Sequence, residues 1–360
     1  FERPEDVNGV ANLGYTDLGF ESDPFETVLA VEHDDYTAET FRRNFDADVW
    51  ETDIRDIDSF TACDADIVVG GPPCQGFSNL NSIKTDELED ERNTLWRQFM
   101  RAVEEIDPDV FLIENVARFL KSQQGARTVQ IAEDLGYTTV VDTLWAHKYG
   151  VPQKRKRGFV LGSKRGVPFF PEELDTEIRT VEDAIGDLPH EPTEENWHVS
   201  RKRVTELSKN RMREVPKGGN RFDIPEELLP DCWKNKDRGG TDLFGRLWWD
   251  RPSVTIRTEF YKPEKGRYLH PEANRSITVR EGARLQTFPD DFEFSGPRTR
   301  VAPQIGNALP PKLAFHLAEA IEAHLNGKES RIDPDAETEH DIFKKSFRIG
   351  EQEQTHLASF

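Results

Sequence analysis

The stretch that decides the fold runs from residue 66 to residue 78 and reads Asp66-Ile67-Val68-Val69-Gly70-Gly71-Pro72-Pro73-Cys74-Gln75-Gly76-Phe77-Ser78. Its apolar first half predicts a buried strand, and its second half predicts a loop that glycine and proline shape. Further apolar runs alternate with helical patterns along the first half of the chain. This alternation predicts an α/β fold with a mostly parallel sheet, in which ligands bind beyond the carboxyl ends of the strands. The expected strands are 27–31, 66–71, 109–113, 138–144 and 158–162, and the expected helices are 37–44, 93–106 and 128–135.

The composition is strongly acidic. The 360 residues include 68 Asp and Glu against 47 Lys and Arg, a formal net charge of -21, which by itself argues against a nucleic-acid partner. An acidic excess spread over the whole chain is also typical of proteins adapted to high salt, so we expect a halophilic protein. Positive charge gathers in two segments, 143–171 and 197–221, which are the candidate surfaces for DNA.

The pattern divides the chain into four parts. Residues 1–167 form the expected catalytic and cofactor-binding domain. Residues 168–272 are rich in Pro, Gly, Arg and Trp and predict a smaller, irregular domain. Residues 273–327 regain helical patterns at 278–286 and 311–325 and return to the first domain, while residues 328–360 are a polar tail. No run of apolar residues is long enough to span a membrane, and three cysteines cannot form a disulfide framework, so we expect a cytoplasmic protein.

Three local patterns could carry chemistry. Cys74 follows a strand within a rigid loop, which is where an α/β enzyme places a nucleophile. Glu114 follows the apolar run 110–113, so its carboxyl group is expected at the same sheet edge and could act as a proton donor. Gln153, Arg155 and Arg157 alternate along an extended segment, so they would share one face and direct their guanidinium groups toward one anion. No pattern of metal ligands is found.

These patterns resemble the DNA (cytosine-5) methyltransferases, which use S-adenosylmethionine. The resemblance covers roughly residues 10–325, and its motifs occur in the family order. Besides the Cys74 loop and Gln153-x-Arg155-x-Arg157, they include Glu114-Asn115-Val116. The remaining motifs are Arg280-Glu281-Gly282-Ala283-Arg284-Leu285-Gln286-Thr287-Phe288-Pro289, which organises the target-recognition region in the family, and Gln304-Ile305-Gly306-Asn307-Ala308-Leu309-Pro310-Pro311. The resemblance implies a Rossmann-like methyltransferase fold with a smaller target-recognition domain at 168–272.

The resemblance also implies the roles of individual residues. Cys74 would attack carbon 6 of a flipped-out cytosine, Glu114 would contact N3, and Arg155 would hold the base near its carbonyl oxygen, with Arg157 and Gln153 beside it. Carbon 5 would then accept the methyl group, in a solitary methylase or in one paired with a restriction endonuclease. The implied cofactor-binding residues are Gly14, Glu32, Asp53, Ile54, Pro72, Leu95 and Asn307. The implied DNA-binding residues are Gln75, Ser78, Arg92, Thr255, Arg201 and Arg203.

One segment departs from the family pattern. The opening glycine loop should lie near 10–15, where only Gly14 remains, and residues 3–9 do not read as a buried strand. A cofactor-defective, non-catalytic DNA-binding paralogue is therefore the first alternative. A tRNA cytosine-5 methyltransferase is the second, although Gly76-Phe77-Ser78 favours DNA. The expected substrate is double-stranded DNA at the nucleoid, acted on by a monomer, and a restriction endonuclease encoded nearby is a further candidate partner.

Overall fold

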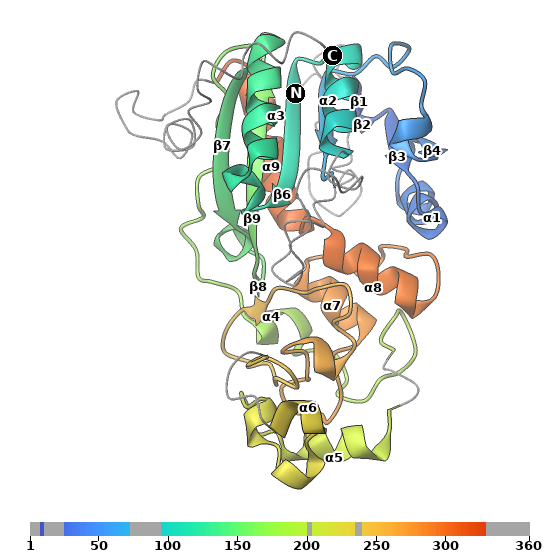
Figure 1. Cartoon of the computed structure of the whole chain (residues 1–360), viewed down its shortest axis with the longest axis vertical. Coiled ribbons are helices and arrows are strands. Elements are labelled where there is room, and N and C mark those ends of the chain that lie inside the picture. Colours follow the sequence, from blue (N-terminus) through green and yellow to red (C-terminus); the bar gives the residue numbers. More distant parts are fainter. Residues whose placement is uncertain (1–7, 11–24, 73–94, 200–203, 235–239, 329–360) are drawn as a thin grey trace.

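The computed structural model describes residues 8–10, 25–72, 95–199, 204–234 and 240–328. One body of the described chain is built on a six-stranded sheet, and a second body carries α4 to α8 (Figure 1). The sheet has the order β2-β1-β5-β6-β9-β7. Its strands are β1 (Asn8–Val10), β2 (Glu26–Thr27), β5 (Ile67–Gly70), β6 (Val110–Val116), β7 (Thr138–Trp145) and β9 (Lys156–Ser163).

Strand direction follows the expectation of a mostly parallel sheet. The pairs formed by β2, β1, β5 and β6 are all parallel, whereas β9 runs antiparallel to both β6 and β7. The α/β class is therefore confirmed. The carboxyl ends of β5, β6 and β7 lie at one edge of the sheet, and this edge also receives the beginning of β9. Residues 67–70 form the strand that the opening stretch of sequence predicted.

Helices cover both faces of the sheet (Figure 1). On one face, α2 (Leu95–Ile106) and α3 (Gln123–Asp134) enclose an apolar cluster that includes Phe99, Phe111 and Val160. On the other face, α9 (Pro311–Leu325) contributes Leu313, Leu317 and Ile321 to a second cluster. The helix expected at 311–325 is thus present with those bounds, and it belongs to the core of the sheet body.

A smaller unit lies beside the sheet. It consists of β3 (Leu29–Glu32) and β4 (Asp48–Glu51), which pair in parallel, and of α1 (Asp35–Asn44) between them. The Asp34 side chain accepts a hydrogen bond from the amide of Thr37 at 3.0 Å and so caps α1. The segment 293–304 docks on α1, because the Thr40 hydroxyl donates to the Gln304 side chain at 2.8 Å.

The second body is largely irregular. Its helices are short, and a two-residue strand, β10 (Ser253–Val254), pairs with β8 (Gln153–Lys154) at the edge of the sheet body. The helices are α4 (Val181–Ile185), α5 (Glu206–Glu214), α6 (Asp231–Lys234), α7 (Val279–Leu285) and α8 (Arg298–Asn307). One apolar cluster joins α4, α7 and α8 to residues 247–268. The described parts of 168–272 and of 279–307 therefore share a core, while the domain limits given above remain a proposal.

Several details of the chain differ from the predicted elements. The predicted strand 27–31 is divided between β2 and β3, which belong to different sheets. Asn8 and Gly9 belong to β1, where no strand was predicted, because their backbone pairs with β2 and β5 although the residues are small or polar. Helix α8 was not predicted either. Its sequence contains Pro303 and overlaps a recognised motif, which obscured its helical pattern. In the described part of the chain, no helix is long and apolar enough to cross a membrane, and no group of side chains could hold a metal ion.

Candidate active site

The site begins where β6 ends beside the loop that follows β5. The buried Asn115 side chain donates a hydrogen bond to the carbonyl of Pro72 at 3.0 Å and so ties the two strand ends together. A side chain on Gly71 would place its Cβ atom 3.3 Å from a carboxylate oxygen of Glu114. The beginning of the nucleophile loop, two and three residues before Cys74, is therefore held against Asn115 and Glu114 at the end of β6.

Glu114 faces Arg157 of β9. The Arg157 Nε atom lies 2.7 Å from Oε1 of Glu114, and both side chains are mostly buried. The N–H group is not aligned with this oxygen, so the contact is an ion pair, and Oε1 has no hydrogen-bond partner among the described residues. The carboxylate is thus held in place electrostatically while one of its oxygens keeps its capacity for a hydrogen bond.

Arg155 is 1% exposed and connects three segments of the chain. Its terminal nitrogens donate to the carbonyls of Ile256, Gly306 and Asn307 at 3.2, 3.0 and 3.3 Å. Burial, together with the charge of Arg157, lowers the pKa of Arg155 to about 9, so the group still carries its charge at neutral pH. Its Nε atom has no hydrogen-bond partner in the described chain, which leaves one donor of a buried cation unused.

The three residues of the Gln-x-Arg-x-Arg motif do not all face one anion. Arg155 and Arg157 both lie within electrostatic range of Glu114. Gln153 is instead fully buried in the packing: its amide nitrogen donates to the Gln286 side chain at 2.8 Å, and its oxygen accepts from the amide of Ile256 at 2.9 Å. Gln153 therefore fixes the segment on which the two arginines lie.

Sequence reasoning quoted Gln286 and Gly306 within motifs but gave them no role. The Gln286 amide also donates to the carbonyl of Ile305 at 2.6 Å, so it links α7 to α8. A Cβ atom on Gly306 would lie 2.5 Å from the backbone of Arg257, so only glycine permits this close approach. The motifs could have marked these two residues as candidates. Only the contacts in the structure show that they hold the carbonyls around Arg155.

The predicted cofactor residues gather at the ends of β3 and β4. The amide of Thr52 donates to the carbonyl of Glu32 at 3.1 Å, which places the ends of these two strands side by side. The Glu32 carboxylate accepts from the amide of Asp34 at 2.9 Å. Asp53 follows β4, and side-chain and backbone hydrogen bonds from Arg55 lower the pKa of Asp53 to about 2. Two carboxylates are thus presented at neighbouring strand ends, which suits the hydroxyl groups of a ribose.

The other described cofactor residues lie around this edge. Arg101 of α2 donates to the carbonyl of Ile54 at 2.9 Å, which fixes α2 against the segment after β4. Leu95 is the first residue of α2, and Pro72 follows β5. Asn307 ends α8 with an exposed side chain, while its carbonyl accepts from Arg155. The set combines acidic groups for hydroxyls with apolar side chains, which fits a nucleoside cofactor.

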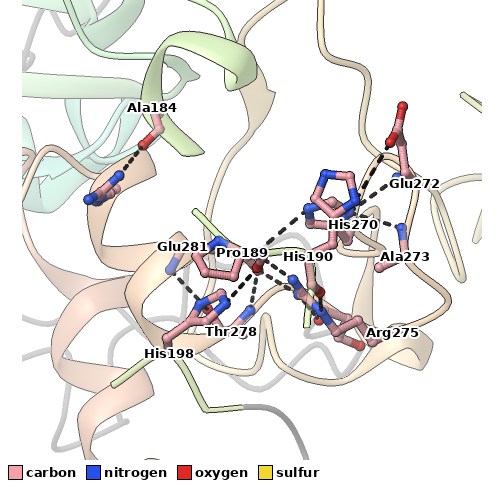
Figure 2. Close-up of polar contacts among 12 residues, drawn as sticks. Ala184, Pro189, His190, His198, His270, Glu272, Ala273, Arg275, Thr278 and Glu281 are labelled. Carbon is pink, nitrogen blue, oxygen red and sulfur yellow. Dashed lines mark hydrogen bonds and ion pairs between the residues drawn. The ribbon is translucent and has the colours of Figure 1, made fainter. Parts of the chain in front are cut away.

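A buried polar network supports the motif helix α7 (Figure 2). The fully buried Glu281 accepts two hydrogen bonds from Arg275, at 2.8 and 2.7 Å, and caps the helix together with Thr278. Burial alone would raise the pKa of Glu281, but Arg275 lowers it overall. His270 lies beside Glu281 and accepts hydrogen bonds from the amides of Glu272 and Ala273. Burial lowers the pKa of His270 to about 4.

Several predicted site residues lie outside the described residues. These are Cys74, Gln75, Ser78 and Arg92 of the nucleophile segment, Gly14 of the opening loop, and Arg201 and Arg203 of the recognition region. Thr255 is described, and its hydroxyl donates to the carbonyl of Lys154 at 2.8 Å. The hydroxyl of Thr255 therefore fastens the recognition region to β8 in this structure.

Comparison with known proteins bears directly on this arrangement. A sequence profile of the C-5 cytosine-specific DNA methylases matches residues 9–323. The chain belongs to the C-5 cytosine-specific DNA methylase family. It is 38% identical over 326 residues to the type II methyltransferase M1.HphI of Haemophilus parahaemolyticus, covering 86% of this chain and 84% of the relative. It is 36% identical over 337 residues to the type II methyltransferase M.Eco47II of Escherichia coli, covering 88% and 78%.

Solved structures support the fold of this methylase. The Dnmt2 methyltransferase of Schizosaccharomyces pombe superposes with a TM-score of 0.57 and 18% identity, covering 84% of this chain and 92% of that protein. The methylase is a DNA (cytosine-5-)-methyltransferase, and its methyl donor is S-adenosylmethionine. The acidic groups at the ends of β3 and β4 fit that cofactor, with Glu32 and Asp53 as the residues that would hold its ribose and adenine.

Proposed function

We propose that this methylase modifies carbon 5 of a flipped-out cytosine within a specific sequence of double-stranded DNA, through a covalent bond to Cys74. Two unused hydrogen-bonding atoms carry this proposal. The buried Nε–H of Arg155 is a donor without a partner, and Oε1 of Glu114 has none either among the described residues. A cytosine ring offers complementary atoms, because its O2 accepts a hydrogen bond and its N3 accepts a proton.

The residues of the chain would act in sequence. The Cys74 thiolate adds to carbon 6 of the ring and forms a carbon–sulfur bond, while a proton held by Glu114 passes to N3 and neutralises the developing charge. Arg155 donates to O2 throughout. Bound S-adenosylmethionine would supply an electrophilic methyl group to carbon 5, and its sulfur would keep the electron pair of the broken bond as S-adenosylhomocysteine leaves. Removal of the carbon-5 proton then returns its electron pair to the ring, and the thiolate leaves as the double bond reforms.

The tie between Asn115 and Pro72 supports this assignment of Cys74. It holds the chain two residues before the nucleophile against the carboxylate that would protonate the base. A reacting base must be within hydrogen-bond reach of its acid, so the loop and β6 have to be in register. Gln75, Ser78 and Arg92 would then contact the extruded nucleotide from the loop, and Thr255, Arg201 and Arg203 would act from the recognition region.

A mechanism-based substrate tests the proposal. DNA containing 5-fluorocytosine cannot lose a proton from carbon 5, so a Cys74 adduct should accumulate when S-adenosylmethionine is present. We expect a denaturation-resistant DNA complex for the wild-type protein in molar salt and none for Cys74→Ala. Cys63→Ser is the matched control, because Cys63 is a half-buried cysteine that precedes β5 in the chain, and it should form the complex. A complex with Cys74→Ala would contradict the role of Cys74.

Calorimetry separates catalysis from the alternative of a non-catalytic paralogue. We expect S-adenosylmethionine to bind and Asp53→Ala to weaken that binding, because the substitution removes one of the two strand-end carboxylates. Glu39→Ala on α1 is a matched acidic control. A wild-type protein that binds DNA but no S-adenosylmethionine would favour the paralogue.

The biological setting is also a proposal. We propose a monomer that acts on cellular DNA at the nucleoid, in a salt-rich cytoplasm to which the net charge of -21 is suited. The curated relatives are named as type II methyltransferases, which supports pairing with a restriction endonuclease. Bisulfite sequencing of host DNA with and without the gene would reveal the target sequence. Light scattering would test the monomer.

A further inference from the structure

An aromatic and basic cluster lies at the end of β7, outside the residues that the proposed chemistry uses. Trp145 is the last residue of β7 and is 40% exposed, which is unusual for a large side chain in this protein. The register of the sheet pairs it with Lys156, whose ammonium group lies 5.5 Å from the centre of the Trp145 ring. We call Trp145, Lys154 and Lys156 the strand-end patch.

The two lysines of the strand-end patch are available to bind an anion from outside the described chain. Lys154 is exposed and Lys156 is half-buried, and neither forms an ion pair with a described residue. Lys148 differs, because it is paired with Glu173 at 3.2 Å. His147 packs edge-on against Trp145 with the ring centres 5.5 Å apart, and burial lowers its pKa, so it adds no charge at neutral pH. Lys156 therefore lies over the exposed ring, and Lys154 adds a second unpaired cation two residues earlier in the chain.

The position of the patch relates it to the active site. Leu144 and Trp145 pair with Arg157 and Lys156, and Arg157 in turn pairs with Val116 at the end of β6. Neighbouring strands lie about 4.8 Å apart, so the backbone of Trp145 on β7 is roughly 10 Å from β6, which carries Glu114, and that of Lys156 on β9 is about 5 Å from it. The beginning of β9 also follows β8, which pairs with β10 of the second body (Figure 1).

We propose that the strand-end patch binds the phosphate backbone of the substrate DNA duplex beside the target cytosine. Lys154 and Lys156 each neutralise a phosphate, and the Trp145 ring covers the adjoining sugar while it holds the Lys156 ammonium in place. Phosphate contacts of this kind fix the position of a duplex without reading its sequence. The inference rests on the proposed function for its substrate and adds the residues that hold the flank of the target site.

Salt dependence gives a direct test. The double variant Lys154→Gln/Lys156→Gln is compared with wild type for binding to a mixture of 40-base-pair duplexes of random sequence. Each lost phosphate contact lowers the slope of log affinity against log salt by about 0.9, so we expect the slope to fall by about 2. Between about 50 and 200 mM NaCl, wild type should lose about tenfold more affinity than the double variant. Equal slopes would overturn the proposal.

A control at the other end of the same strand makes the test specific. Lys164→Gln/Arg165→Gln removes the same charge after β9, where both residues pair with the acids Asp107 and Asp109. The control should keep the wild-type slope, and thermal melting should show that both double variants are folded. A control slope that falls as far as that of the patch variant would show a general charge effect and overturn the proposal.

The contribution of the Trp145 ring can be tested separately from that of the lysines. Trp145→Ala should weaken binding severalfold with little change in the salt slope, because the ring contact releases no counterion. Unchanged affinity in Trp145→Ala would remove the tryptophan from the proposal. Methyl transfer to the same duplexes, measured in parallel, separates the two ideas. A wild-type protein that binds DNA but transfers no methyl group refutes the proposed function, whereas the slopes still decide the patch.

Discussion

The two bodies of this methylase position their functional groups in different ways. In the sheet body, Glu114, Asn115 and Arg157 are placed by the hydrogen-bond ladder that joins β6 to β9. In the second body the same task falls to buried arginines. Arg246 is 3% exposed and donates five hydrogen bonds, among them to the carbonyls of Val215 at 3.0 Å and Met212 at 2.8 Å.

Arg267 works in the same way as Arg246. It is 5% exposed and donates to the carbonyls of Gly218, Gly219 and Arg246 at 2.8 to 2.9 Å. A body with few strands leaves many backbone carbonyls without a partner, and a guanidinium group can satisfy several of them at once. In an irregular segment, buried arginines can therefore satisfy the backbone carbonyls that neighbouring strands satisfy in a sheet. A high arginine content there does not by itself indicate phosphate contacts.

The largest expected effect is on the rate of methyl transfer and comes from Glu114 in the sheet body. Glu114→Gln keeps the shape of the side chain but removes the acid, so the rate of methyl transfer should fall by about 10²- to 10⁴-fold. DNA affinity should change little and β6 should keep its place in the ladder, although loss of the ion pair with Arg157 should lower the thermal stability. Single-turnover transfer of labelled methyl groups measures the rate. Glu39→Gln on the surface of α1 is the matched control, and an undiminished rate in Glu114→Gln would exclude its role as the acid.

The next effect concerns the arginines of the second body. Arg246→Met leaves several buried carbonyls without donors, so the free energy of unfolding should fall by about 3–5 kcal/mol. Urea denaturation followed by tryptophan fluorescence measures the loss. Arg251→Met, which removes an exposed arginine that pairs with Asp250 and lies over the Trp248 ring, should change the midpoint far less. Equal midpoints for the two variants would show that the buried arginine network is not what holds this body.

A third test uses pH. The pKa of His270 is lowered to about 4 in the fold, whereas it is near 6.5 in an unfolded chain. The unfolded state therefore binds the extra proton first as pH falls, and stability should decrease by about 2–3 kcal/mol between pH 6.5 and pH 4. His270→Asn retains an acceptor for the amides of Glu272 and Ala273, and it should flatten this part of the stability profile. An identical profile for the variant would contradict the assignment to His270.

The smallest effect is expected at Thr255. Thr255→Val removes one hydrogen bond, to the carbonyl of Lys154, so unfolding should become easier by about 1 kcal/mol. If the hydroxyl serves only this tie, DNA affinity at fixed salt should stay within twofold. A large loss of affinity with unchanged stability would instead assign Thr255 to the DNA interface. Thr61→Val, on an exposed turn, provides the control.

The sequence predicts more of the secondary structure of the sheet body than of the second body. The strand 67–70 and the first four residues of the strand 110–116 are apolar runs, and the pattern of 311–325 is a long amphipathic helix, so local periodicity reveals them. The strand at Asn8–Val10 was not predicted, because its place in the sheet depends on backbone pairing with β2 and β5. No local pattern in the residues marks it.

The site shows the same limit at the level of single residues. Glu114 and Arg155 could be selected because their motifs are distinctive. The role of Gln153 could not be predicted, because its partners Gln286 and Ile256 are more than 100 residues away in the chain. Likewise, the basic segment 197–221 was predicted to face DNA, but its Arg221 is buried and donates to the carbonyl of Gly240. Burial depends on tertiary packing, which composition does not contain.

The contacts of Arg155 have a consequence for protein engineering. Its three carbonyl partners, Ile256, Gly306 and Asn307, all lie outside residues 204–245, the stretch that holds several carbonyl partners of Arg246 and Arg267. A graft that exchanged residues 204–245 of this methylase would leave those partners and the Gln153–Gln286 link in the host protein. The recognition region could therefore be replaced as a cassette, provided that the donor segment supplies carbonyls for Arg246 and Arg267. Specificity would then be transferable between relatives without rebuilding the catalytic edge.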